Sequence, residues 1–319
     1  MKRLLLCTTL LALIFIGCQT NRKTNTNFDT TKFKVKIITF VPHEVLDAVV
    51  NSTQNSLIED FNLPKDNISI FNPNGNLDEI RTYVRTLNTQ NTDLIISVST
   101  PATQAVLSSR HPSIPLLFSF VSDTASLNIS SYNNVTGISN VLNYQKGFEL
   151  LKQILPNAKS ICVVFNPSEP NSNYSYNQIV ENAKKQTPPI TVITRQFTKT
   201  DEIGPTASTV SNIDAFYVGG DNKLVQNINQ LLDVANNKKI PIFASDEGSV
   251  KAGAIAAFSI DYNDFGKETS KLAIDILKNK SCLGIKILMY KEGKCVINRN
   301  SLINLQIDTN LVSGCKQMN

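Results

Sequence analysis

LIISVSTPATQAVLSS, residues 94–109, is an apolar run followed at once by the start of a helix. Nearly every side chain of residues 94–98 is apolar, which is typical of a strand that is covered on both faces. Pro101 suits the first helical position, and Thr100 before it suits the N-terminal cap. A buried strand that leads directly into a helix predicts a parallel sheet with helices packed on it.

The same alternation of apolar run and helical spacing recurs along the chain and restarts after Pro156. The runs predict strands at residues 35–40, 68–71, 94–98 and 116–120, then at 160–165, 190–195, 215–218, 242–244 and 254–260, with short closing strands at 285–289 and 296–298. Two such sets predict an α/β fold with two doubly wound parallel-sheet lobes. Because ligands bind beyond the carboxyl ends of such strands, two facing rims predict a cleft between the lobes.

Composition restricts the classes of function. The chain has 319 residues, enough for two ordinary domains, and its 41% apolar and 18% charged residues argue against a disordered chain. The net charge of +5 is spread thinly, so no basic stripe indicates nucleic-acid binding. His43 and His111 are too few for a multi-histidine metal site, and the cysteine spacing has no zinc signature. We therefore expect no metal, no cofactor and no nucleic-acid partner.

The first residues have the features of an export signal. Lys2 and Arg3 precede the apolar run 4–16, whose thirteen residues reach roughly 20 Å as a helix, short of a membrane core of about 30 Å. Residues 1–17 are therefore predicted to be a cleaved signal peptide. Gly17-Cys18 directly after the run indicates a bacterial lipoprotein, in which Cys18 is acylated and residues 18–32 form a lipidated tether to the membrane. The alternative is an ordinary secretory signal in which Cys18 is incidental.

Four cysteines follow the signal and Cys18. Cys162 lies in an apolar run and is interpreted as a small core residue. Cys282, Cys295 and Cys315 would lie in an oxidising compartment, where a disulfide is possible. We consider the pairing of Cys282 with Cys295 first, and the other pairings stay open.

Polar side chains follow several of the predicted strands. The start of a helix at Thr100 offers free N–H groups that can receive a carboxylate or a phosphate, although plain helix capping is the alternative. An Asp on the same rim would pair with an ammonium group, so the two together would suit an amino-acid zwitterion. Capping alone would also explain Asp221, Asn222 and Asp246. Their joint occurrence on one predicted rim favours a binding site.

Short motifs in a fixed order resemble one family. They are STPATQA at residues 99–105, NPSEPNS at 166–172, DAFYVGGDN at 214–222 and IPIFASDE at 240–247. From about Val35 to Leu305 the chain resembles the ABC-transporter substrate-binding lipoproteins related to tryptophan and tyrosine binders, which have the type I periplasmic-binding-protein fold. Residues 42–47 and 219–220 depart from the pattern of that family.

The resemblance implies a hinge of three crossing segments, near residues 137–141, 259–263 and 289–294. The N-terminal lobe would comprise residues 33–139 and 262–290, and the C-terminal lobe residues 140–261 and 291–319. The resemblance also implies a membrane permease and a cytoplasmic ATPase as partners. The residues expected to bind the ligand are Phe40, Pro42, Ser99, Thr100, Phe120, Asp123, Asn166, Asn171, Asp221, Asn222 and Asp246.

We therefore expect an exported, lipid-anchored solute-binding protein of an ABC importer, which takes a small zwitterion such as an aromatic or related amino acid and is not an enzyme. A surface sensor or adhesin on the same fold is one alternative. An exported α/β enzyme is another, but the sequence has no Gly-x-Ser-x-Gly, Walker A or Gly-x-Gly-x-x-Gly motif. A sugar-responsive repressor core shares the fold, but the export signal and the lack of a DNA-binding head argue against it.

Overall fold

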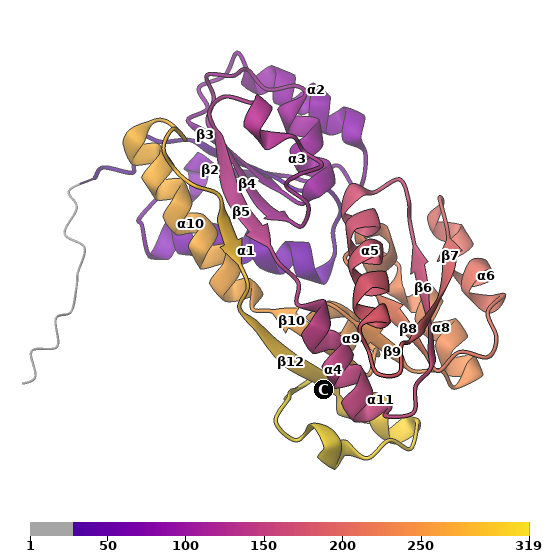
Figure 1. Ribbon diagram of the computed structural model, residues 1–319. Helices are drawn as coiled ribbons and strands as arrows, with labels where there is room; N and C mark the ends of the chain where they lie inside the picture. Colours follow the sequence, from indigo (N-terminus) through magenta and orange to yellow (C-terminus); the bar gives the residue numbers. More distant parts are fainter. Residues whose placement is uncertain (1–27, 319) are drawn as a thin grey trace, which may run out of the picture.

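The structure is a computed structural model that describes residues 28–318. The predicted signal peptide, Cys18 and most of the tether lie outside the described residues. The described chain forms two lobes, each built on one sheet with helices on both faces (Figure 1). The predicted α/β fold with two parallel-sheet lobes is therefore confirmed. No helix within residues 28–318 is long and apolar enough to cross a membrane.

The first lobe contains a parallel sheet of six strands in the order β11-β5-β4-β3-β1-β2. These strands are β1 (Val35–Ile38), β2 (Ile68–Phe71), β3 (Leu94–Val98), β4 (Leu116–Val121), β5 (Val135–Asn140) and β11 (Leu288–Tyr290). Its helices are α1 (Glu44–Glu59), α2 (Leu77–Leu87), α3 (Thr100–Leu107) and α10 (Tyr262–Asn279). Helices α1 and α10 pack together on one face, and α2 packs beside α3 on the other (Figure 1).

The second lobe contains a sheet of seven strands in the order β13-β12-β10-β9-β8-β6-β7, in which β12 runs antiparallel to β10. These strands are β6 (Ser160–Phe165), β7 (Thr191–Gln196), β8 (Ala215–Val218), β9 (Ile242–Ala244), β10 (Ala256–Ile260), β12 (Gly293–Asn298) and β13 (Lys316–Met318). Its helices are α4 (Tyr144–Ile154), α5 (Pro170–Lys184), α6 (Ile203–Ser208), α7 (Asn222–Gln226), α8 (Ile228–Lys238), α9 (Glu247–Ala252) and α11 (Arg299–Asn304).

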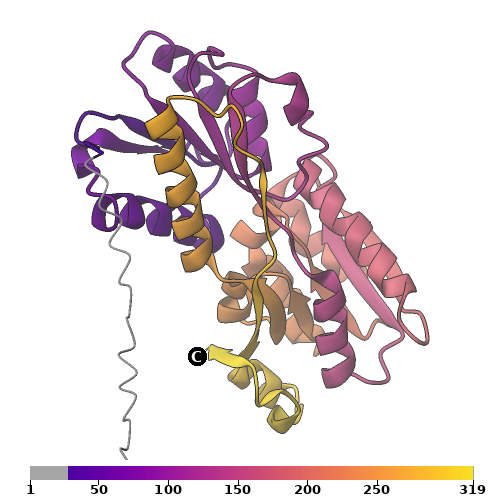
Figure 2. The ribbon, with the colours of Figure 1, turned by 60° about the vertical axis from the view of Figure 1, so that its left-hand side comes forward.

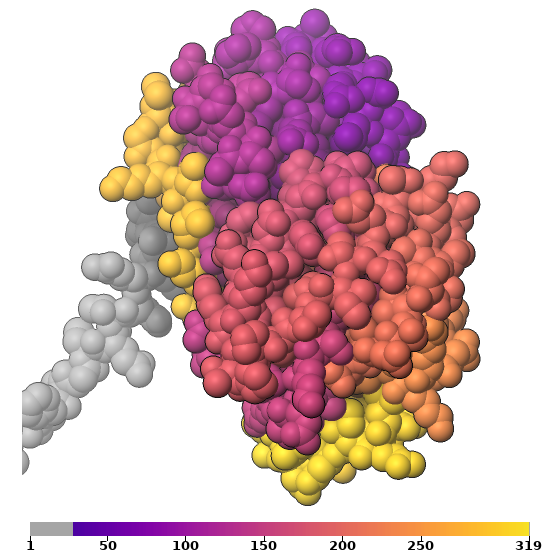
Figure 3. All heavy atoms as spheres, turned by 45° about the vertical axis from the view of Figure 1, so that its right-hand side comes forward, coloured from indigo at the N-terminus to yellow at the C-terminus, as the bar shows by residue number. Residues whose placement is uncertain are grey.

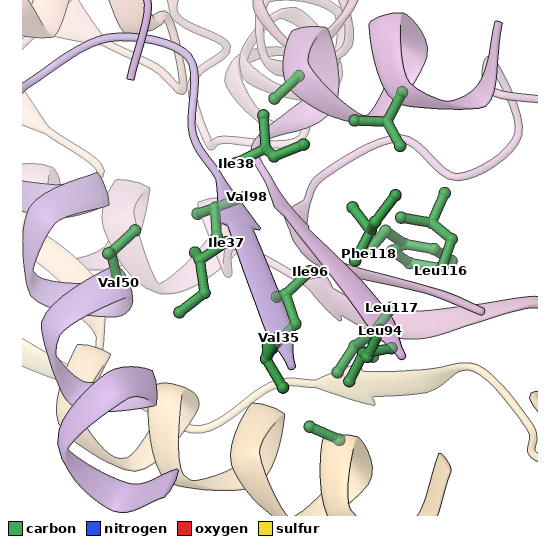
Figure 4. Packing of buried hydrophobic residues seen from close by; sticks show 14 of the residues in the cluster. Val35, Ile37, Ile38, Val50, Leu94, Ile96, Val98, Leu116, Leu117 and Phe118 are labelled. Atoms are coloured by element: carbon green, nitrogen blue, oxygen red, sulfur yellow. The ribbon is translucent and has the colours of Figure 1, made fainter. Parts of the chain in front are cut away.

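The central strands of the first lobe form its core, and Figure 4 shows Ile37, Ile96 and Leu117 packed among the surrounding elements. All three side chains are fully buried, because each strand is covered on both faces. Helix α10 approaches α1 closely at Gly266, where an added Cβ would lie 2.5 Å from the Cβ of Ser52. The lobe therefore depends on a glycine at this contact, since any larger residue would push the two helices apart.

The chain crosses between the lobes three times: after β5, after β10 and after β11 (Figures 1 and 2). The crossing segments contact one another, because the Val141 N–H donates to the Tyr290 carbonyl at 2.9 Å. Lys294 Nζ also lies 2.6 Å from Asp261 Oδ2. Three short links held side by side are the arrangement in which two rigid lobes can rotate.

One disulfide prediction is wrong. Cys295 pairs with Cys315, with a Cα–Cα distance of 4.8 Å, because Cys295 of β12 lies beside the residue that directly precedes the paired strand β13. Cys282 instead lies buried in the first lobe, where its Sγ is 3.6 Å from the Leu116 carbonyl. Cys162 is a buried residue of the second lobe, as predicted.

Candidate functional site

A cavity lies between the lobes, at the carboxyl ends of their strands. Figure 3 shows the two lobes in contact on either side of this junction. The cavity has a volume of about 40 Å³. It is lined by His43, Val45, Ser99, Thr100, Phe120, Ser122, Asn140, Leu142, Asn171, Gly219, Gly220, Asp221, Asn222, Val225, Ser245, Asp246 and Tyr262.

The first lobe contributes the N-terminus of α3. Its N-cap is Ser99 rather than Thr100, since Ser99 Oγ accepts a hydrogen bond from the Ala102 N–H at 3.4 Å. Thr100 therefore takes the first helical position, where a backbone N–H has no acceptor within the helix. Its hydroxyl is buried and has no hydrogen-bond partner among residues 28–318. Both groups of Thr100 are available to a ligand.

Ser99, directly after β3, and Phe120, near the end of the neighbouring strand β4, hold unusual backbone conformations. Their φ angles are +92° and +57°, in a region that costs a residue other than glycine about 1–3 kcal/mol. Such strain is maintained mainly where it serves a site, and both residues line the cavity. The conformation of Ser99 lets β3 lead directly into α3, so that the start of the helix faces the cavity.

The second lobe contributes buried acids, of which Asp221 is the first. Asp221 caps α7 and accepts hydrogen bonds from the Leu224 N–H at 2.9 Å, the Asn166 N–H at 2.7 Å and the Ser172 hydroxyl at 2.6 Å. Burial, together with the negative charge of Glu169, raises the pKa of Asp221 well above its ordinary value. Three donors hold the carboxylate, and no cation of residues 28–318 pairs with it, so a positive ligand group would stabilise its charged form.

Asp246 is the second acid of this wall. It caps α9 and accepts from the Ser249 N–H at 2.6 Å and the Ser249 hydroxyl at 2.8 Å. Burial raises its pKa to about 6, and the charge of Glu44 contributes. Within residues 28–318 no ion pair involves Asp246 or Asp221. The wall is therefore a receptor for positive charge.

His43 connects the two lobes. It caps α1 through Nδ1, which accepts from the Leu46 N–H at 3.4 Å, so the proton lies on Nε2. Nε2 then donates to Asn222 Oδ1 of the second lobe, also at 3.4 Å. Burial lowers the pKa of His43 to about 4, and the imidazole is therefore neutral at pH 7. Because the contact exists only while the lobes are together, His43 belongs to the closed arrangement.

Further contacts hold the lobes together. Lys251 Nζ of α9 lies 2.9 Å from Glu44 of α1, and Gln226 Nε2 donates to Asn74 Oδ1 at 3.2 Å. Val225 of α7 packs against the core of the first lobe. The structure is therefore a closed form of the two lobes.

Apolar side chains form the rest of the lining. Phe120 meets Tyr262 edge to face, with 5.8 Å between the ring centroids. Val45 and Phe120 come from the first lobe, and Leu142 and Val225 lie where the second lobe meets it. A ligand with a polar head and an apolar side chain would satisfy both parts of the cavity.

The structure brings together seven of the eleven residues that the sequence predicted to bind ligand. These are Ser99, Thr100, Phe120, Asn171, Asp221, Asn222 and Asp246. They come from both lobes and from strand ends that are far apart in the chain. The expectation that ligands bind beyond the carboxyl ends of parallel strands therefore located residues on both walls of the cavity.

Four predicted residues do not line the cavity. Phe40 is buried in the core of the first lobe, and Pro42 is exposed. Asp123 accepts from two backbone N–H groups of the turn that follows it. Asn166 is buried behind the wall, where its N–H holds Asp221. In each case the residue follows a strand, but local packing or turn geometry directs it away from the cavity.

Other lining residues had no specific signal in the sequence. His43 and Tyr262 line the cavity because the lobes and the crossing segments meet there. Asn140 is the last residue of β5, and Leu142 lies just beyond it at the first crossing. Their position after a strand or at a predicted hinge was the only indication. Among the described residues, no group of His, Cys, Asp and Glu is placed to hold a metal ion.

Comparisons with known proteins agree with this geometry. Residues 34–312 match the model of a family described as ABC transporter substrate binding protein. The tyrosine-binding protein of Clostridioides difficile (strain R20291) is 31% identical over 300 residues, which cover 90% of this chain and 86% of that protein.

Two solved structures are informative about the arrangement of the lobes. One is an ABC domain from Streptococcus pneumonia in complex with L-Trp: it is 26% identical, has a TM-score of 0.83, and the match covers 90% of this chain and 99% of that one. The other is the ligand-free, open structure of a Clostridium difficile substrate binding protein with adhesive properties: it is 27% identical, has a TM-score of 0.69, and the coverage is again 90% and 99%. The higher score for the liganded structure is consistent with closed lobes.

Two α/β lobes around a shared cavity define a solute-binding protein of the two-lobed class. The family match covers most of the chain, and the relatives agree with it. The chain belongs to the ABC transporter substrate binding protein family. This is a family of extracytoplasmic binding proteins and not a family of enzymes.

Proposed function

We propose that this chain is the lipid-anchored solute receptor of an ABC importer, held on the extracytoplasmic face through Cys18, and that its cavity captures an amino-acid zwitterion for delivery to a permease. The observation that carries the proposal is the opposite chemistry of the two cavity walls. The first lobe offers hydrogen-bond donors at the start of α3, and the second lobe offers buried acids that pair with no cation in the described part of the chain.

The carboxylate of the solute would lie against α3. The Thr100 N–H and hydroxyl are both free to donate, and the strained backbone at Ser99 holds them at the cavity. The helix dipole adds about 0.3–1 kcal/mol, or up to about 2 kcal/mol where water is excluded. This wall would therefore favour an anion over a neutral group.

The ammonium group would lie against the second lobe. Asp246 and Asp221 both line the cavity, and Asn171 Oδ1 is a buried acceptor without a partner in the described part of the chain. An ammonium has three N–H donors and a positive charge, which match three acceptors and compensate the burial of the acids. The apolar lining, with Phe120 and Tyr262, would accept an aromatic or other apolar side chain.

A solute held in this way touches both lobes at once. It would therefore bind the closed form more tightly than the open form and shift the equilibrium toward closure. The three crossing segments would act as the hinge, and the contact between His43 and Asn222 would form as the lobes meet. The named ligands of the relatives, tyrosine and L-Trp, support an amino acid as the solute.

Thermal unfolding of the mature protein with each of the twenty amino acids tests the solute. At a hundred times the dissociation constant, a ligand stabilises the folded state by about 2.7 kcal/mol, which raises the melting temperature of a chain of this size by roughly 4 °C. Ribose and glucose are the controls and should have no effect. If no amino acid raises the melting temperature, the zwitterion hypothesis is wrong. A mass spectrum of the mature N-terminus tests acylation of Cys18 separately.

An adhesive role is the second candidate, and the solved relative with adhesive properties favours it. Adhesion would use the outer surface rather than the cavity. A variant that no longer binds solute would then adhere to cells as well as the wild type. Loss of solute uptake with unchanged adhesion would assign both roles to the protein.

A further inference from the structure

Glu169 is a buried acid behind the cavity wall, with 3% of its surface exposed. It precedes α5, and its carboxylate receives only N–H donors. Oε2 accepts from the Asn222 N–H at 3.1 Å, from Asn222 Nδ2 at 2.8 Å and from Asn171 Nδ2 at 3.3 Å, while Oε1 accepts from the Lys223 N–H at 3.2 Å. Glu169 is therefore the common partner of two asparagines that line the cavity.

A carboxylate can only accept, so it determines which way both amides point. Asn171 turns its NH₂ group toward Glu169 and the Gly220 carbonyl, the latter at 2.8 Å. Its Oδ1 is left without a partner among the described residues, although the side chain is only 5% exposed and lines the cavity. Asn222 likewise turns its NH₂ group to Glu169 and its Oδ1 to His43 of the first lobe.

The opposite amide orientations would change the chemistry of the wall. With Asn171 rotated, an NH₂ group would take the place of Oδ1 and repel the N–H groups of an ammonium. With Asn222 rotated, its NH₂ group would meet the Nε2–H of His43. Two donors would then face each other, and this hydrogen bond between the lobes would be lost. One buried acid thus controls both an acceptor for the ligand and a contact of closure.

We propose that Glu169 is a positioning residue, which holds Asn171 and Asn222 so that the second lobe accepts N–H donors from the solute and meets His43 on closure. This inference rests on the proposed function and adds the residue that makes the site selective for an amino group. Its charge also raises the pKa of Asp221, but Glu169 itself does not touch the solute and orients the wall through the two amides.

Glu169→Gln tests the proposal, because it keeps the shape but brings its own N–H donors, so the amides are no longer fixed. The readout is the ratio of dissociation constants for an amino acid and for the same molecule without its amino group. The probes are L-tyrosine with 3-(4-hydroxyphenyl)propionate and L-leucine with 4-methylpentanoate. We expect binding of the amino acid to weaken by about 10–100-fold and binding of the deaminated acid by a clearly smaller factor, because the deaminated acid loses only the closure contact between Asn222 and His43. A purely structural role would weaken both equally.

Glu181→Gln is the matched control, since Glu181 lies on the same helix but is exposed, and it should leave the ratio unchanged. Asn171→Ala removes the acceptor directly and should also reduce the ratio, which keeps the proposal testable if Glu169→Gln does not fold. A wild-type ratio in Glu169→Gln or Asn171→Ala would overturn the positioning role alone. A wild type that binds none of the amino acids would contradict the proposed function and this inference with it.

Discussion

Asp246→Asn should stabilise the ligand-free protein and weaken binding. The side chain is 7% exposed, and burial raises its pKa from an ordinary value near 3.8 to about 6. At about 1.4 kcal/mol for each pKa unit, the ionised form lowers the free energy of unfolding by about 3 kcal/mol. Because the pKa is raised in the folded protein, this loss is absent below pH 3.8 and complete above pH 6.

Asparagine removes the charge and retains the cap, since its oxygen can still accept from the Ser249 N–H. We expect urea unfolding at pH 7.5 to show a gain of about 1–3 kcal/mol without ligand. The ammonium of the solute loses its partner, so calorimetry should show affinity lower by about 2–5 kcal/mol.

The matched control is Asp308→Asn, because Asp308 is an exposed helix cap that accepts from the Asn310 N–H at 2.9 Å. It should change neither stability nor binding. An Asp246→Asn variant that binds as tightly as the wild type, or that unfolds more easily, would refute the reasoning.

Three other predictions follow from the same geometry. Thr100→Val should leave urea unfolding nearly unchanged, because the hydroxyl has no partner to lose, and should weaken binding about tenfold in calorimetry; unchanged affinity would contradict the assigned carboxylate site. The dissociation constant should rise as the pH falls from 7 to 5. Closure buries His43, which lowers its pKa and requires the neutral imidazole, whereas binding of the ammonium requires the ionised form of Asp246, whose pKa is raised by burial. A dissociation constant that does not change with pH would argue against both roles. Cys315→Ser opens a disulfide that spans 20 residues and should lower the free energy of unfolding by about 3 kcal/mol without changing affinity; wild-type stability in urea would count against this.

The sequence predicted the sheet interiors well. The strand Leu94–Val98 was predicted with its observed bounds. All five of its residues are buried, and a central strand that is covered on both faces accepts few polar side chains. The strand predicted at 35–40 ends at Ile38, since the chain leaves the sheet at its rim before Phe40. β13 had no apolar run to reveal it, because this edge strand is mostly exposed.

The candidate site was predictable only in part, because strand ends indicate a rim but not which side chains turn into the gap. Asp221 and Asp246 were expected from this rule and line the cavity. The parts played by His43 and Glu169 depend on contacts between segments more than fifty residues apart. The Cys295–Cys315 pair likewise depends on β12 lying next to β13, which no local pattern revealed.

A crystal structure of the protein with the amino acid that stabilises it most would test the central claim most directly. The account predicts one solute molecule between the lobes, with its carboxylate within hydrogen-bond distance of Thr100. Its ammonium should lie beside Asp221, Asp246 and Asn171. A solute in the reverse orientation, or one bound to a single lobe, would contradict the account.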